Sequence, residues 1–245
     1  MVGVVRGLTV CVAGLVATTL VLGVGAVGWI VGLACGLVLA VATQRRALVD
    51  GVETLGPADL VTLTRATRAC GVAALVAESY AGHDVVAALV PLTVVALALD
   101  FVDGRVARRT GTASAFGARL DGEADAFLIL VLSAYVVRDH GGWVLGLGLV
   151  RYVYAVAERV VPWMQQQLPP RYWRKVVAAY VGVGLALAAS GLAPAPAAYG
   201  GLVLAAVLLA ESFGWDVVWL WRCRDAVNRA SADDVRTGKS FQRNR

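Results

Sequence analysis

The chain has 245 residues, of which 59% are hydrophobic and 16% are charged, and its mean hydropathy is +0.71. These values lie outside the range of ordinary soluble domains, and no segment is both long and polar enough to form a separate soluble domain. The formal net charge of +5 is better explained by basic loops on one side of a membrane than by nucleic-acid binding. We therefore expect an integral membrane protein without a nucleic-acid partner.

Eight apolar segments follow one another along the chain. A bilayer core of about 30 Å requires roughly 20 apolar residues per helix, and fewer where helices are short or tightly packed. Polar and turn residues separate the segments, as in "AGHD", "RDHGG" and "LAPAPAAYG". The sequence thus predicts an all-α membrane protein with spans over residues 7–23, 26–42, 60–80, 85–101, 115–137, 143–161, 174–191 and 197–221.

Basic residues are distributed unevenly among the loops between these spans. Alternate loops carry Arg45 and Arg46, the cluster within residues 105–109, the segment 171–175 and the C-terminal tail, whereas the opposite loops carry only Arg138. Because Lys and Arg favour cytoplasmic loops, this asymmetry predicts an even number of spans with both termini in the cytoplasm. We expect the protein to reside in the cell (plasma) membrane.

The predicted spans divide the chain into three parts. Residues 1–44 are expected to form a transmembrane hairpin of two helices, residues 45–221 a membrane core, and residues 222–245 a basic, disordered cytoplasmic tail. A cleaved signal peptide, with small residues ending at Ala26, is the alternative for the N-terminus.

The stretch "LDFVDGRVARRTGTASAFGARLDGEAD", residues 99–125, contrasts with the apolar text around it. Asp100 and Asp103 are three residues apart near the end of one predicted helix, and Asp121 and Asp125 are four apart on the next. Each pair shares a helix face, so two neighbouring helices can bring four carboxylates together. Carboxylates at membrane depth repel one another and lose hydration, which calls for a cation between them.

The donor atoms of these four side chains indicate which cation fits. An all-oxygen set without His or Cys suits a hard divalent ion, Mg²⁺ or Mn²⁺, which also binds substrate phosphates. Gly104, Ala107 and Gly117 leave room for a ligand to approach the backbone, and Arg108 can hold a phosphate with two hydrogen bonds. The stretch therefore predicts a metal-bound diphosphate site.

The same residues resemble a family signature. The pattern D-x-x-D-G-x-x-A-R-x8-G-x3-D-x3-D of the CDP-alcohol phosphatidyltransferase family is matched at every fixed position, namely at Asp100, Asp103, Gly104, Ala107, Arg108, Gly117, Asp121 and Asp125. Upstream, "DLVTLTR" resembles the family's N-x-x-T-x-x-R helix opening, with Thr62 and Arg65 in place and Asp59 where Asn is usual. The resemblance covers about residues 57–221.

This resemblance implies a six-transmembrane-helix core, a homodimer and an active site facing the cytoplasm. It also implies a reaction, in which an alcohol attacks the β-phosphorus of a CDP-linked lipid and CMP is released, as in phospholipid biosynthesis. Asp100, Asp103 and Asp121 would be the main metal ligands, and Asp125 would be the catalytic base and also touch a metal. The CDP contacts would be Gly104, Ala107, Arg108, Gly117 and Thr62.

The acceptor alcohol is less well indicated than the donor. Arg65, Arg151 and Lys175 are the candidate acceptor or headgroup contacts, because arginine within a span is costly unless it faces a cavity or a partner. Such residues suit a phosphorylated acceptor, such as glycerol phosphate or inositol phosphate, and they suit phospholipid headgroups equally well. The sequence does not choose between these ligands.

Two other classes of membrane protein use carboxylates in a similar way. An Asp-rich prenyltransferase would bind Mg²⁺ and a polyprenyl diphosphate, but it needs two separate Asp-rich motifs and this chain has one. A cation transporter would place its acids near the bilayer midplane on several distant helices. The products separate the three hypotheses: CMP for the first, pyrophosphate for the prenyltransferase and neither for the transporter.

Overall fold

A computed structural model describes residues 2–21, 23–52, 56–110, 115–166, 168–169 and 171–237. Within these ranges, the side chains of residues 2–8, 10–11, 21, 57–58, 100–110, 115 and 225–237 lie outside the description. The described chain is all-helical and contains no strand, which confirms the predicted all-α class. Its α-helices are α1 (Val2–Val21), α2 (Ala26–Val49), α3 (Pro57–Tyr80), α4 (Val86–Thr110), α5 (Ala115–His140), α6 (Leu145–Val160), α7 (Tyr172–Ser190) and α8 (Ala195–Thr237), with short 3₁₀ turns at Gly142–Val144 and Pro162–Gln165.

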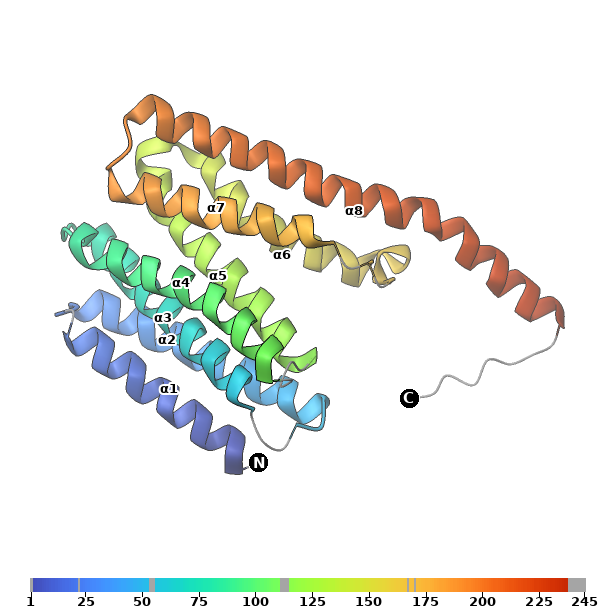
Figure 1. Cartoon of the computed structure of the whole chain (residues 1–245), viewed down its shortest axis with the longest axis horizontal. Coiled ribbons are helices and arrows are strands. Elements are labelled where there is room, and N and C mark those ends of the chain that lie inside the picture. Colours follow the sequence, from blue (N-terminus) through green and yellow to red (C-terminus); the bar gives the residue numbers. More distant parts are fainter. Residues whose placement is uncertain are drawn as a thin grey trace.

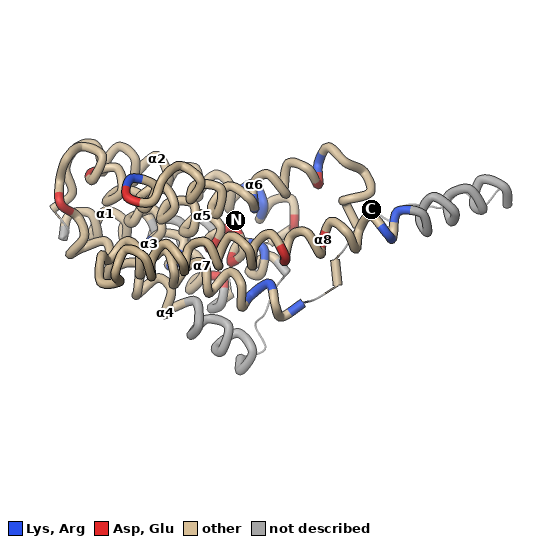
Figure 2. Tube along the Cα trace, turned by 90° about the horizontal axis from the view of Figure 1, so that it is seen from above, with Lys and Arg blue, Asp and Glu red and all other residues tan. Residues whose placement is uncertain are grey.

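Each of the eight apolar segments expected from the sequence coincides with one of these helices. Three helical stretches among the described residues are long and apolar enough to cross a membrane, and they are Ala26–Val49, Asp59–Tyr80 and Ala195–Arg224. A shorter apolar stretch covers Val86–Leu99. Most of the described chain carries no charge, and its Lys, Arg, Asp and Glu residues occupy short segments (Figure 2). The number of spans in the core remains a prediction.

Helix α3 lies in the middle of the fold and contacts α1, α2, α4 and α5 (Figure 1). Its apolar window is 72% buried, compared with 17% for α2 and 22% for α8. The main core joins α3 to α4, α5, α7 and α8 through fully buried residues that include Val72, Leu89, Leu132, Val181 and Leu202. Polar side chains that project from α3 are therefore held by neighbouring helices.

A buried carboxylate fixes the N-terminal helices on this core. The backbone N–H of Gly28, in the first turn of α2, donates to Oε1 of Glu78 on α3 at 2.6 Å. Glu78 is 4% exposed, and its Oε2 lies 2.9 Å from Nδ1 of the exposed His83. A carboxylate at a helix N-terminus satisfies free N–H groups and complements the helix dipole. Helix α2 is thus docked on α3, although it lies outside the six-helix core expected from the sequence.

Two helices continue past boundaries that were expected from the sequence. The division at residue 44 falls inside α2, which continues through Arg45 and Arg46 and ends before Gly51 at a φ of 67°. The tail expected to be disordered from residue 222 is helical to Thr237, because α8 runs on without interruption. No Gly or Pro lies between Gly214 and Gly238, and the Ala and Arg residues there favour a helix. Residues 238–245 lie outside the described part of the chain.

Close packing of α6 on α5 leads to a testable prediction. A Cβ atom at Gly148 would overlap Cα of Leu130 and lie 3.0 Å from its Cδ1, whereas a Cβ at Gly146 would have no neighbour within 4 Å. Gly148→Ala is expected to lower the free energy of unfolding by about 1–3 kcal/mol, because a backbone atom cannot move aside cheaply. The control Gly146→Ala should change it by less than about 1 kcal/mol. Equal stability of both variants in detergent would contradict this packing.

Candidate active site

Two aspartates of the motif face one buried arginine. Asp121 and Asp125 lie one turn apart near the start of α5, and Oδ1 of each contacts Nη2 of Arg65 on α3, at 2.6 and 2.5 Å. The same nitrogen is 3.4 Å from the backbone oxygen of Asp121. The Arg65 side chain is 3% exposed, and the two carboxylates are 33% and 34% exposed. The expectation that Asp121 and Asp125 share a helix face is confirmed.

Among the described side chains, one guanidinium meets two carboxylates at this point, a combination with a formal charge of −1. Each of the two carboxylates is about one third exposed. The Arg65 side chain does not extend towards bulk water, because it is buried and forms ion pairs with Asp121 and Asp125.

The first half of the motif lies on α4. The backbone is helical through Asp100, Asp103, Gly104, Ala107 and Arg108, so the two aspartates lie three residues apart on one helix, as expected. Their side chains lie outside the described residues. Within the described side chains, no group of three or more His, Cys, Asp or Glu residues is placed to hold a metal ion. Of the four predicted metal ligands, Asp121 and Asp125 are thus the two whose side-chain contacts the structure describes.

Two predicted CDP contacts lie close to these carboxylates along their helices. Thr62 is 5% exposed and lies three residues before Arg65 on α3. Gly117 is buried and lies four residues before Asp121 on α5. Residues three or four apart share a helix face, so Thr62 lies on the same face of α3 as Arg65, and Gly117 lies on the same face of α5 as Asp121.

The helix that carries Thr62 and Arg65 begins at a defined cap. Asp59, which stands where the family has Asn, accepts a hydrogen bond from the backbone N–H of Gly56 at 2.9 Å. Asp59 is 4% exposed, and Pro57 occupies the first turn, where its missing N–H is not needed. The substitution of Asp for Asn therefore retains an oxygen that can cap α3.

Arg151 lies in a different place from the aspartates. Its Nη2 is 3.3 Å from Oε1 of Glu123 on α5. Glu123 is two residues from both Asp121 and Asp125, and at 3.6 residues per turn it projects from the opposite side of α5. The described contact of Arg151 is therefore with Glu123, on the side of α5 away from the aspartate pair, and its expected role as an acceptor or headgroup contact stays a prediction.

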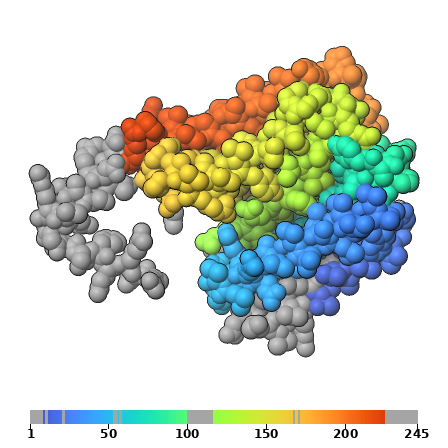
Figure 3. Space-filling view, turned by 180° about the vertical axis from the view of Figure 1, so that it is seen from behind, coloured from blue at the N-terminus to red at the C-terminus, as the bar shows by residue number. Residues whose placement is uncertain are grey.

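A polar pocket opens beside this ion pair, which we call the α2–α5–α6 pocket. It has a volume of about 270 Å³ and is bordered by Gln165 and by Arg46, Glu123, Arg151, Ala155, Glu158 and Arg159. In Figure 3, the surface is hollowed between the end of α2 and α6, with α5 behind them. Arg46 was not predicted as a site residue, because only the fold brings it to residues more than a hundred positions away.

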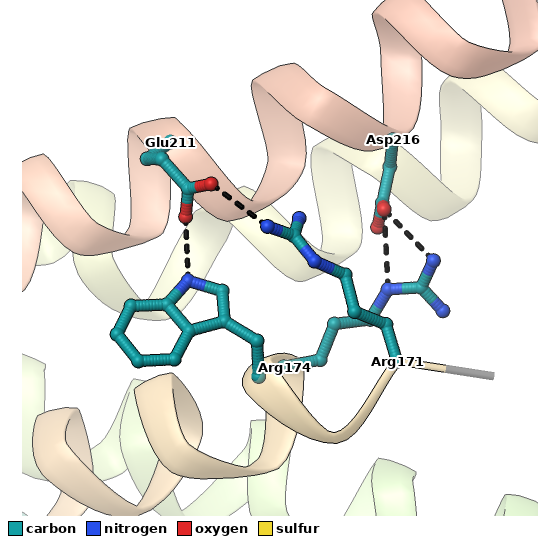
Figure 4. Close-up of polar contacts among 5 residues, drawn as sticks. Arg171, Arg174, Glu211 and Asp216 are labelled. Carbon is teal, nitrogen blue, oxygen red and sulfur yellow. Dashed lines mark hydrogen bonds and ion pairs between the residues drawn. The ribbon is translucent and has the colours of Figure 1, made fainter.

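Polar residues at the start of α7 form a set of contacts with α8, which we call the α7–α8 clamp (Figure 4). Arg171 Nη2 lies 3.0 Å from Oε1 of Glu211, whose Oε2 accepts from Trp173 Nε1 at 2.6 Å. Arg174 donates through Nε and Nη2 to Oδ1 of Asp216 at 3.1 and 2.8 Å. The charges of Arg171 and Arg174 are thus paired with carboxylates of α8. The predicted acceptor contact Lys175 is exposed and does not border the α2–α5–α6 pocket.

Comparison with known proteins assigns the chain to a family. A family model described as CDP-alcohol phosphatidyltransferase matches residues 55–220, about two thirds of the chain. Searches of curated proteins and of solved structures found no significant match. The matched range contains α3 to α7, most of α8, Arg65 and all four motif aspartates.

Members of the family are generally dependent on a divalent metal ion. The family match and the three apolar helices long enough to cross a membrane together support an integral membrane transferase. The chain belongs to the CDP-alcohol phosphatidyltransferase family.

Proposed function

We propose that this protein transfers a phosphatidyl-type group from a CDP-linked lipid to an alcohol acceptor, with release of CMP, in phospholipid biosynthesis. The observation that carries the proposal is the pairing of Asp121 and Asp125 on one buried cation, Arg65, inside the range that matches the family. The reaction would take place on the cytoplasmic side of the plasma membrane, in a homodimer whose core follows an N-terminal pair of helices.

The carboxylates present fit a divalent ion. Asp121 and Asp125 already converge on one positive group and expose about a third of their side chains. With Asp100 and Asp103 they make an all-oxygen donor set suited to Mg²⁺ or Mn²⁺. We assign Asp100, Asp103 and Asp121 as the main ligands and Asp125 as a further one. When bound, the ion would neutralise the diphosphate and stabilise negative charge on the departing CMP.

Asp125 would act as the general base. Its carboxylate accepts the proton of the acceptor hydroxyl as that oxygen attacks the β-phosphorus. The new bond joins the acceptor oxygen to phosphorus, and the bond that breaks joins the same phosphorus to the oxygen bridging to CMP. The acceptor leaves as a phosphodiester, and the proton resides on Asp125 until water removes it.

Arg65 would be a positioning residue in this reaction. Because one of its nitrogens contacts both carboxylates, it fixes their side-chain rotamers before substrate binds. This role fits its burial better than the acceptor contact expected from the sequence. Gly104, Ala107, Arg108, Gly117 and Thr62 remain the proposed CDP contacts.

The proposal is tested by measuring CMP release from CDP-diacylglycerol by the purified protein with Mg²⁺ or Mn²⁺. Glycerol phosphate, inositol phosphate, inositol and serine would be offered in turn as acceptors. Metal-dependent CMP release with one acceptor is the expected result. Folded protein that binds no CDP and releases no CMP with any acceptor would contradict the proposal. Pyrophosphate release from a polyprenyl diphosphate would instead support the prenyltransferase hypothesis.

A further inference from the structure

We propose that the α2–α5–α6 pocket is a second site, separate from the aspartate site, that binds the phosphate group of a ligand. Arg46 of α2, which precedes the family-matched residues 55–220, completes it. The ligand chemistry is a phosphate monoester or phosphodiester anion, whether free in solution or on a lipid headgroup. The site rests on the pocket itself and does not require the proposed transferase reaction.

The α6 side of the pocket is one continuous helix face. Arg151, Ala155, Glu158 and Arg159 follow the spacing i, i+4, i+7 and i+8, which repeats on one side of a helix. Ala155 is the small residue between the two arginines and leaves the space that a ligand would occupy. Nη1 of Arg159 donates to the Ala155 carbonyl at 3.2 Å, which holds the guanidinium along this face.

The α2 side is held in place by independent contacts. Ala47, next to Arg46, is 3% exposed and forms a small core cluster with Phe116 at the start of α5. Asp50, one turn later, lies 3.5 Å from Nη1 of Arg119 on α5. These contacts anchor the last turn of α2 against α5, so Arg46 projects into the pocket from a fixed backbone. A cation at this position is also favoured by the C-terminal end of the helix dipole.

The charges of the pocket favour an anion. Three arginines and two glutamates line it, so its formal charge is positive. Among the described residues of the pocket, Arg151 forms an ion pair with Glu123, with 3.3 Å between Nη2 and Oε1. Guanidinium groups bind phosphate oxygens with paired, charge-assisted hydrogen bonds. The volume of about 270 Å³ is below the range of about 300–1,000 Å³ typical of drug-sized ligands, and thus suits a small head group.

The position of Glu123 separates this pocket from the reaction site. Glu123, which borders the pocket, projects from the side of α5 opposite to Asp121 and Asp125, and neither aspartate borders the pocket. The helix α5 therefore carries two charged faces, one towards α3 and one towards α6 and the end of α2. A phosphate bound in the pocket would join α2 and α6 to the helix that bears the aspartates.

The test uses the full-length protein in phosphatidylcholine nanodiscs with EDTA, so that no divalent ion recruits phosphate to the aspartates. Binding of inorganic phosphate and of glycerol phosphate is measured by calorimetry. Arg46→Gln is expected to weaken binding at least about fivefold, because one charge-assisted contact is lost. The matched control Arg45→Gln removes the same charge from the adjacent residue, which does not border the pocket, and should leave binding within about twofold.

A second arm distinguishes the source of the phosphate. Nanodiscs containing phosphatidylglycerol are prepared without soluble phosphate, and native mass spectrometry counts the anionic lipids retained by each variant. Dependence on Arg46 in the soluble arm alone assigns a free phosphate ligand, and dependence in the lipid arm alone assigns a headgroup. Equal effects of Arg45→Gln and Arg46→Gln, or no binding of either probe by the unmodified protein, would overturn the proposal.

CDP binding with Mn²⁺ is measured on the same preparations. Both variants are expected to bind CDP as the unmodified protein does, since neither residue lies at the aspartates. Unmodified protein that fails to bind CDP but binds phosphate through Arg46 would refute the proposed reaction and leave the second site in place.

Discussion

Replacing Asp125 by asparagine is expected to lower the rate of CMP release at least about 100-fold, because a positioned general base contributes about 10²–10⁴-fold. Asparagine has nearly the same shape, so it can still accept a hydrogen bond from Arg65, which contacts the Asp125 carboxylate at 2.5 Å. The fold should therefore persist, and the loss should appear in kcat. CMP release is measured at saturating CDP-diacylglycerol and divalent ion.

Asp139→Asn is the matched control for this change. Asp139 lies on the same helix, α5, but is exposed near its far end. Its replacement should leave the rate within about twofold, because it contacts neither substrate nor metal in the proposed site. Asp125→Asn protein with the rate of the control would remove Asp125 from the catalytic role.

Replacing Arg65 by methionine is expected to lower the free energy of unfolding by about 2–4 kcal/mol in the absence of divalent ions. Loss of one member of a buried ion pair leaves the partner charge uncompensated, at a cost of about 3–5 kcal/mol, and the partial exposure of the carboxylates reduces this. Both carboxylates would face each other without the guanidinium that contacts them at 2.6 and 2.5 Å. Thermal unfolding in detergent with EDTA measures the change.

Divalent ions should restore part of the stability of Arg65→Met, because a metal between the aspartates replaces the lost positive charge. Arg68→Met is the control, since Arg68 lies one turn further along α3 and does not contact the aspartates. It should be much less destabilised and should gain no more from Mn²⁺ than the unmodified protein. If Arg65→Met gains no more from Mn²⁺ than Arg68→Met, the aspartates do not bind the metal.

The sequence predicts the elements of this fold well because its strongest signal is local. A run of apolar residues between polar turns indicates a helix wherever it packs, and all eight segments are helical. Asp121 and Asp125 share a face for the same reason, since a spacing of four is one helical turn. The boundaries were less accurate, because arginines such as Arg45 and Arg46 end a predicted span without ending the helix.

Contacts between distant residues were not predictable in the same way. Arg65 is separated by 56 and 60 positions from Asp121 and Asp125, and periodicity does not reveal which helix faces which. The position of Glu123 opposite the aspartates follows from the sequence alone, but its pairing with Arg151 depends on α6 packing against that side of α5. For that reason neither the pairing of Arg151 nor the position of Arg46 beside it could be predicted from the sequence.

Helix α3 connects these observations. It receives α2 through Glu78 at one end and places Arg65 against α5 at the other. Because α3 is the most buried of the three apolar helices long enough to cross a membrane among the described residues, its side chains are held more rigidly than those of an outer helix. A rigid α3 keeps the two carboxylates in one geometry, which a reaction that depends on positioning requires.

The transfer itself is tested most directly by ³¹P NMR of one reaction mixture. The mixture contains the protein, CDP-diacylglycerol, the acceptor identified by CMP release, and a buffer with Mg²⁺ but no Mn²⁺. We expect the diphosphate signals to disappear while CMP and a new phosphodiester lipid form in equal amounts, and we expect no change with EDTA. Formation of CMP with phosphatidic acid and no phosphodiester would show hydrolysis in place of transfer, and this result would contradict the proposed function.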